Sequence, residues 1–113
     1  PSFYLDERER LQQSLGGNKA LILRNHGLLA TGKTVPEAFM RLYRLERSAQ
    51  VQIDAAAAGK LRIVGDNVAA HSRDGVESFI ADGTQNGGGM DYGRMEFAAL
   101  MRKLDKIDPS YRD

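Results

Sequence analysis

The stretch that decides the fold is ALILRNHGLLATG, residues 20–32, in which two apolar runs flank Asn25-His26-Gly27. Asn and Gly tolerate positive φ angles, so these three residues favour a tight turn between two short strands. Both runs are apolar on both faces of the pleat, a pattern typical of strands that are covered above and below. A two-stranded hairpin alone is marginally stable. We therefore expect a larger sheet, completed by further chain or by a second copy.

Helical patterns lie on both sides of this hairpin. Residues 5–17 (LDERERLQQSLGG) predict a short helix that Asp6 caps and Gly16-Gly17 end. A long helix follows the hairpin, with Thr34 and Glu37 in capping-box spacing and an end at Gly59. The buried face expected for this helix has steps of three and four residues: Ala38, Leu42, Leu45, Ala49, Ile53 and Ala56.

The rest of the chain reads as helices separated by loops. Residues 66–83 predict a helix capped by Asp66 and weakened by Gly75, and residues 84–93 (TQNGGGMDYG) have the composition of a loop. Residues 94–108 predict a last helix, and residues 109–113 are expected to be a tail. The apolar positions of the last helix are Phe97, Leu100, Met101 and Leu104.

Composition narrows the class of protein. The chain has 113 residues, the size of one domain or part of one. Charged residues make up 27% and nearly cancel at +1, so we expect neither nucleic acid nor a membrane as partner. The absence of cysteine excludes thiolate chemistry and favours an intracellular, cytoplasmic setting. No apolar run approaches the ~20 residues that span a bilayer, and no signal peptide is visible. The first residue, Pro1, suggests a processed product or a piece of something longer.

Residues 20–53 resemble the class II aldolase/adducin family: an apolar strand, Asn-His-Gly, a second apolar strand, a capping Thr, and a helix containing Glu-Ala-Phe. The resemblance continues at residues 93–113, which are similar to bacterial adducin-like members, and is weakest between residues 59 and 89. It implies that residues 1–113 are the C-terminal half of the family domain, without the N-terminal half. The implied fold class is α/β, part of a three-layer α/β/α domain with a mostly antiparallel sheet. The order is helix, β-hairpin, long helix and further helices.

The resemblance also implies a metal site. Family members hold zinc or another divalent metal with a His-x-His pair from the N-terminal half and with the histidine of Asn-His-Gly, which is His26 here. The metal polarises a substrate carbonyl and stabilises an enediolate during carbon–carbon cleavage. This sequence has no His-x-His. Three protein ligands are typical of a catalytic zinc site, so we expect no metal and no activity from these residues alone. Without the resemblance, His26 reads as a turn histidine hydrogen-bonded to nearby backbone.

Other candidate residues carry weaker signals. His71 is expected to face solvent on a surface helix. Tyr92 and Tyr111 correspond, in position only, to late tyrosines that donate protons in some family enzymes; packing and tail anchoring are the simpler interpretations. Residues 86–89 (NGGG) could cradle a phosphate, but they follow no strand and lack the Lys and Ser or Thr of a P-loop. The catalytic residues stay otherwise unknown.

Two functions follow from the resemblance. The first is a metal-dependent class II aldolase, an aldehyde-lyase for a small hydroxy-carbonyl or sugar-phosphate substrate. The alternative is a non-catalytic, adducin-like assembly module, because adducin head domains resemble the aldolase fold without being known for its catalysis. A His-x-His pair and a catalytic Glu upstream would distinguish them. Unpaired apolar strand edges invite pairing, and family members are commonly tetramers, so we expect a homo-oligomer, a dimer or a tetramer.

Overall fold

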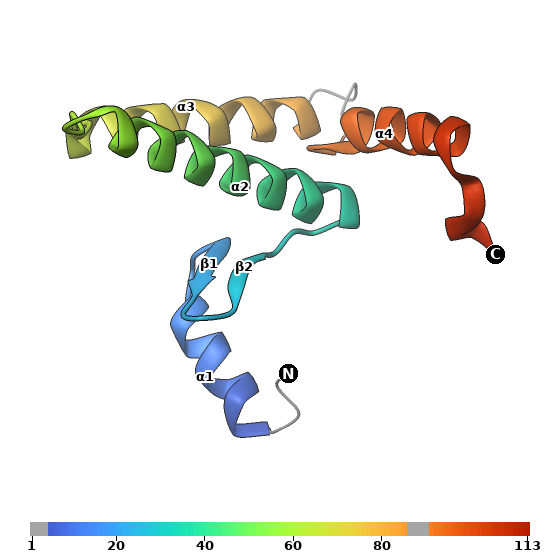
Figure 1. Cartoon of the computed structure of the whole chain (residues 1–113), viewed down its shortest axis with the longest axis horizontal. Helices are drawn as coiled ribbons and strands as arrows, with labels where there is room; N and C mark the ends of the chain where they lie inside the picture. The colour runs from blue at the N-terminus through green and yellow to red at the C-terminus, as the bar shows by residue number, and fades with distance from the viewer. Residues whose placement is uncertain (1–4, 86–90) are drawn as a thin grey trace.

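The structure is a computed structural model that describes residues 5–85 and 91–113 (Figure 1). It confirms the expected order of helix, hairpin, long helix and further helices. In the described residues the elements are α1 (Leu5–Leu15), β1 (Ala20–Leu23), β2 (Gly27–Ala30), α2 (Val35–Ala58), α3 (Asp66–Gln85), α4 (Arg94–Ile107) and the 3₁₀ turn η1 (Pro109–Arg112). None of the described helices is long and apolar enough to cross a membrane.

The hairpin forms as the turn residues predict. Its strands are antiparallel, with Ala20 opposite Ala30 and Leu23 opposite Gly27. Asn25 has a φ of 56° and Gly27 a φ of 145°, conformations that these two residue types tolerate better than most. The backbone N–H of His26 donates to the carbonyl of Leu23 at 3.2 Å and closes the turn. Residue chemistry at the tip therefore sets the hairpin geometry.

The described chain is open rather than compact. In Figure 1 the hairpin lies between α1 and α2, with α3 and α4 beyond α2. The radius of gyration is 17.2 Å, whereas a compact domain of this length has about 13 Å. Met40 is the sole buried apolar side chain in the part whose side chains are described, and Ile22 of β1 is 76% exposed. The hairpin thus keeps the uncovered apolar surface that its sequence predicts.

Two predictions for α2 meet different outcomes. The Thr34 hydroxyl accepts from the N–H of Glu37 at 3.2 Å, so the predicted cap is confirmed. The predicted buried face is wrong over the second half of the helix, where Ile53 is 65% exposed and Ala56 is also exposed. The first half is only partly covered: α4 packs there and buries Met40, which lies off the predicted face, whereas Leu42 on that face is 39% exposed. Periodicity identified an apolar face, but only a packing partner buries one.

Several predicted boundaries also shift. Asp6 and Asp66 lie inside the first turns of α1 and α3 rather than ahead of them. Gly75 does not interrupt α3, which continues to Gln85 in the segment predicted as loop. The expected tail is ordered: Pro109 starts η1, and the Asp108 carboxylate accepts from the N–H of Ser110 at 3.1 Å. Hydrogen bonds from the side chain of Ser110 and then from its backbone N–H lower the pKa of Asp108.

A glycine sets the contact between α2 and α4. Gly93 precedes α4 with a φ of 84° and is buried against the first turns of α2. A Cβ there would lie 2.6 Å from the carbonyl oxygen of Pro36 and 2.7 Å from Cγ of Met40. The close approach brings Phe97 edge-on to Phe39, with ring centroids 5.3 Å apart. Only glycine permits this packing of the two helices.

A buried ion pair joins the hairpin to α2. Glu37 is 7% exposed, and its carboxylate accepts from the N–H of Lys33 at 2.8 Å and pairs with Arg41 one turn later. Arg41 donates to the carbonyl of Thr31 at 2.8 Å, and the Thr31 hydroxyl donates to the carbonyl of Lys19 at 3.1 Å. These bonds connect the bases of both strands to the first turns of α2 and therefore orient the hairpin tip.

Candidate functional site

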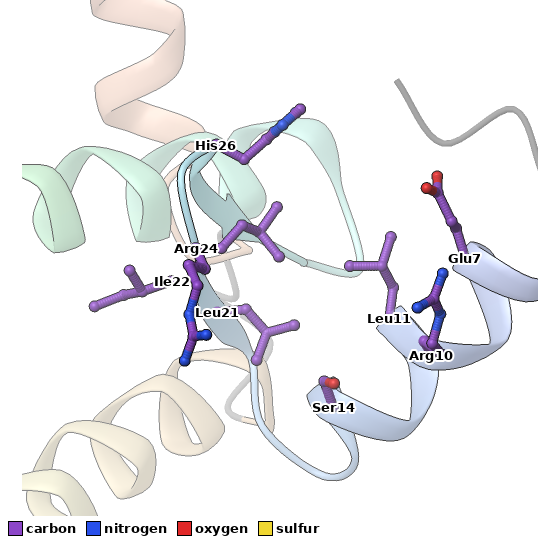
Figure 2. A pocket seen from close by; sticks show the side chains of 9 residues that line it. Glu7, Arg10, Leu11, Ser14, Leu21, Ile22, Arg24 and His26 are labelled. Carbon is purple, nitrogen blue, oxygen red and sulfur yellow. The ribbon is translucent and has the colours of Figure 1, made fainter.

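The candidate site is the exposed tip of the hairpin, where His26 lies. Figure 2 shows the imidazole directed away from the strands. Among the described residues its ring makes no hydrogen bond, whereas its backbone N–H is bonded to Leu23. The simpler interpretation, a histidine hydrogen-bonded to nearby backbone, therefore holds for the backbone of His26 and not for its ring. The residue as a whole is exposed.

The described residues do not make a metal centre by themselves. Over residues 5–85 and 91–113, no three His, Cys, Asp or Glu side chains form a group that could hold a metal ion. His71 is exposed on α3, as predicted, and does not join such a group with His26. A catalytic zinc site needs about three protein ligands. At the hairpin tip the described residues offer one imidazole ligand, that of His26, and they do not fit a metal without additional donors.

A cleft of about 450 Å³ lies beside His26, between α1 and β1. Leu11 of α1 and Leu21 of β1 are directed into this space in Figure 2, and Arg10 lies at its edge on α1. Arg24 and His26 point in different directions from the end of the strand. The cleft is therefore an apolar gap with charged edges, and its polar groups do not converge on the imidazole.

The structure places the two candidate tyrosines elsewhere. Tyr92, half-buried ahead of α4, lies under the guanidinium of Arg44, 5.2 Å from its ring centroid. Neither tyrosine lines the cleft beside His26. The contact between Tyr92 and Arg44 supports a packing role for this tyrosine rather than a role as proton donor. The NGGG segment, residues 86–89, lies outside the described residues.

Tyr111 anchors η1 to α4. Its hydroxyl donates to the carboxylate of Asp105 and accepts from Nε of Arg112 at 3.1 Å. Arg112 also pairs with Asp105 at 2.7 Å. The hydrogen bond to Tyr111 and then the charge of Asp105 raise the pKa of Arg112. These contacts support the tail-anchoring interpretation of Tyr111.

Sequence reasoning missed the structural importance of Arg41. Its position lies off the predicted apolar face of α2, yet its side chain is only 18% exposed and contacts both Glu37 and Thr31. The available signal was the spacing of four residues between Glu37 and Arg41, which places opposite charges on one helix face. Arg41 therefore fixes the orientation of the hairpin relative to α2, because it bonds to both.

Comparisons with known proteins fit this hairpin and helix. The family described as "Class II Aldolase and Adducin N-terminal domain" matches residues 3–53. The crystal structure of an aldolase II superfamily protein from Pseudomonas syringae superposes with a TM-score of 0.75 at 35% identity, over 97% of this chain. The chain belongs to the class II aldolase/adducin family. The superposition also confirms the predicted α/β fold class.

Individual members of the class II aldolase/adducin family match beyond the hairpin. A Pseudomonas aeruginosa protein named "Putative aldolase class 2 protein" is 35% identical over 108 residues, which is 95% of this chain and 40% of that relative. Gamma-adducin of Mus musculus is 34% identical over 113 residues, 90% of this chain and 15% of the relative. The chain therefore spans about two fifths of the bacterial relatives and a smaller part of the adducin.

Proposed function

We propose that this chain is part of a metal-dependent class II aldolase-type lyase, in which His26 is one ligand of a divalent metal. The observation that carries the proposal is the exposed imidazole at the hairpin tip, whose ring has no hydrogen-bond partner among the described residues. A ligand histidine needs a free ring nitrogen and a fixed position. The turn and the Glu37–Arg41 pair hold the backbone that carries this ring.

The other ligands, in this proposal, come from residues outside these 113 or from another copy of the chain. The absence of a three-ligand group over residues 5–85 and 91–113 requires such a source. The extent of the relatives agrees with it, since the chain spans two fifths of the bacterial ones. We accordingly assign residues 1–113 to the C-terminal half of the family domain. Bound zinc, or another divalent metal, would supply Lewis-acid polarisation of a carbonyl.

The substrate class proposed is a small hydroxy-carbonyl compound, including sugar phosphates. The role of this chain is to present the imidazole of His26 to the metal, which would bind a ring nitrogen that carries no proton. No other residue of the described chain is assigned a step.

The test compares His26→Ala with His71→Ala in the protein as its gene encodes it. Both histidines are exposed, so neither substitution should disturb packing. Bound zinc is measured by mass spectrometry of the metal, and cleavage is measured by aldehyde release from a panel of hydroxy-carbonyl compounds. We expect His26→Ala to lower metal affinity by about 10–100-fold or more and to abolish cleavage, while His71→Ala changes neither. Unchanged metal content in His26→Ala would refute the proposal.

A second candidate is a non-catalytic, adducin-like assembly module that forms homo-oligomers. Gamma-adducin is 34% identical over 90% of this chain, and the exposed apolar face at Ile22 offers a surface for association. This candidate predicts no cleavage by the natural protein and self-association in light scattering. Ile22→Asp should weaken that association, because a charge would have to be buried at the interface. Cleavage activity that depends on His26 would count against this candidate.

A further inference from the structure

A second cleft, of about 360 Å³, lies where the start of β1, the middle of α2 and α3 meet. In the view of Figure 1, α2 runs between β1 and α3. Cationic side chains reach the cleft from all three: Lys19 ahead of β1, Arg41 and Arg44 on α2, and Arg73 on α3. Glu77 is the one carboxylate among the residues that line it. Four cations against one carboxylate give the lining a net positive charge, which favours an anionic ligand.

Arg44 is the cation that local carboxylates leave unpaired. Within residues 5–85 and 91–113 it makes no ion pair, and its guanidinium lies over the ring of Tyr92, 5.2 Å from the ring centroid. A guanidinium held on an aromatic face keeps its N–H groups free in the plane, where they can bind a phosphate or carboxylate with two hydrogen bonds. Arg41, by contrast, is bonded to Glu37 and Thr31.

The other two cations, Lys19 and Arg73, are in ion pairs that are exposed to solvent. Lys19 pairs with Glu77 at 2.9 Å, with half of each side chain exposed, and Arg73 pairs with the adjacent Asp74 at 3.1 Å. The hydrogen bond from Lys19 lowers the pKa of Glu77, so this carboxylate is charged at neutral pH. Exposed ion pairs of this kind are weak. An entering dianion can therefore recruit Lys19 and Arg73 in addition to Arg44.

We propose that this cleft binds a small molecule through a phosphate group, with Arg44 as the principal contact and Arg73 and Lys19 as the supporting ones. Its volume lies in the usual range for small-molecule sites. Val76 of α3 and Ala20 of β1 give it an apolar wall for the rest of the ligand. None of its lining residues lines the cleft beside His26, so the proposal does not depend on the proposed lyase activity.

The test is titration calorimetry with inorganic phosphate at low ionic strength, on the protein as its gene encodes it. Arg44→Gln is compared with Arg47→Gln, since Arg47 is exposed on the same helix and does not line the cleft. We expect saturable binding by the wild type, a loss of about five-fold or more in affinity for Arg44→Gln and for Arg73→Gln, and less than about two-fold for Arg47→Gln. Circular dichroism checks that each variant is folded.

Three results would overturn the proposal. One is no saturable phosphate binding by the folded wild type up to about 10 mM, a limit set by millimolar affinity. Another is an equal loss for Arg44→Gln and Arg47→Gln, which would indicate a diffuse effect of net charge. The third is displacement of phosphate by acetate at equal concentration, which would reassign the cleft to carboxylates. Displacement by sulfate and not by acetate supports the assignment to a tetrahedral dianion.

Discussion

The Glu37–Arg41 ion pair gives the sharpest test of how the hairpin is held. Glu37→Ala removes the acceptor for the N–H of Lys33 and leaves Arg41, 18% exposed, without its carboxylate. A hydrogen bond to a charged group contributes about 1.5–3 kcal/mol, and breaking a buried pair by removing one partner costs about 3–5 kcal/mol. Because Arg41 keeps its bond to Thr31 and some solvent contact, we expect the lower part of the range, about 3 kcal/mol.

A double-mutant cycle separates the pair from its surroundings. Glu37→Ala, Arg41→Ala and the double variant are unfolded with urea in the protein as its gene encodes it, with Arg47→Ala as the exposed control. We expect a coupling energy of about 1–3 kcal/mol between Glu37 and Arg41, an unchanged slope with urea, and an effect within about 0.5 kcal/mol for Arg47→Ala. Coupling below about 0.5 kcal/mol would mean that the two side chains act independently and that their ion pair does not hold the hairpin on α2.

Three further outcomes can be measured on the same protein. Gly93→Ala should lower the free energy of unfolding by more than about 1 kcal/mol, because residue 93 has a φ of 84° and the new Cβ would lie 2.6 Å from the carbonyl oxygen of Pro36. Gly75→Ala is the matched control in α3, where a new Cβ would have no atom within 4 Å, and it should raise the stability measured by thermal unfolding by up to about 1 kcal/mol. Thr34→Ala should cost about 1 kcal/mol in urea unfolding, because it removes the acceptor for the N–H of Glu37, and Thr34→Ser should restore most of it. The pKa of Asp108 is lowered by its hydrogen bond to Ser110, so the stabilisation of η1 is present above the ordinary pKa of that carboxyl and is lost as the pH falls through the lowered value. Hydrogen exchange of the Ser110 amide should accelerate in acid relative to its intrinsic rate, and Asp108→Asn should remove this dependence; an unaltered pH profile in Asp108→Asn would contradict the assignment.

Local chemistry predicted the parts of this fold that depend on neighbouring residues. Asn25 and Gly27 adopt the positive φ angles that their residue types allow, and Thr34 caps α2 through its hydroxyl. The prediction weakened where burial depends on a distant partner. Ile53 has the correct helical spacing but no described element packs on it, so its spacing alone could not predict its exposure.

The candidate sites also differ in whether they depend on neighbouring residues or on residues distant in sequence. The position of His26 followed from the turn, whereas the phosphate cleft could not be predicted, because Lys19 and Glu77 are 58 residues apart in sequence. The interpretation of Tyr111 as an anchor rather than a proton donor required the contact with Asp105. Sequence patterns therefore predict the local backbone structure, whereas contacts formed only in the folded chain determine which charged side chains lie close together.

The apolar pattern of the strands has a consequence for folding specificity. In most hairpins an alternation of polar and apolar residues fixes the pairing, since a slip of one residue would turn the apolar face to water. In ALIL and GLLA both faces are apolar, so a slipped pairing would carry no such cost. The register that pairs Ala20 with Ala30 must then be set by the turn. The three residues that present the imidazole are also the three that prevent misaligned hairpins, so selection on either property constrains the other.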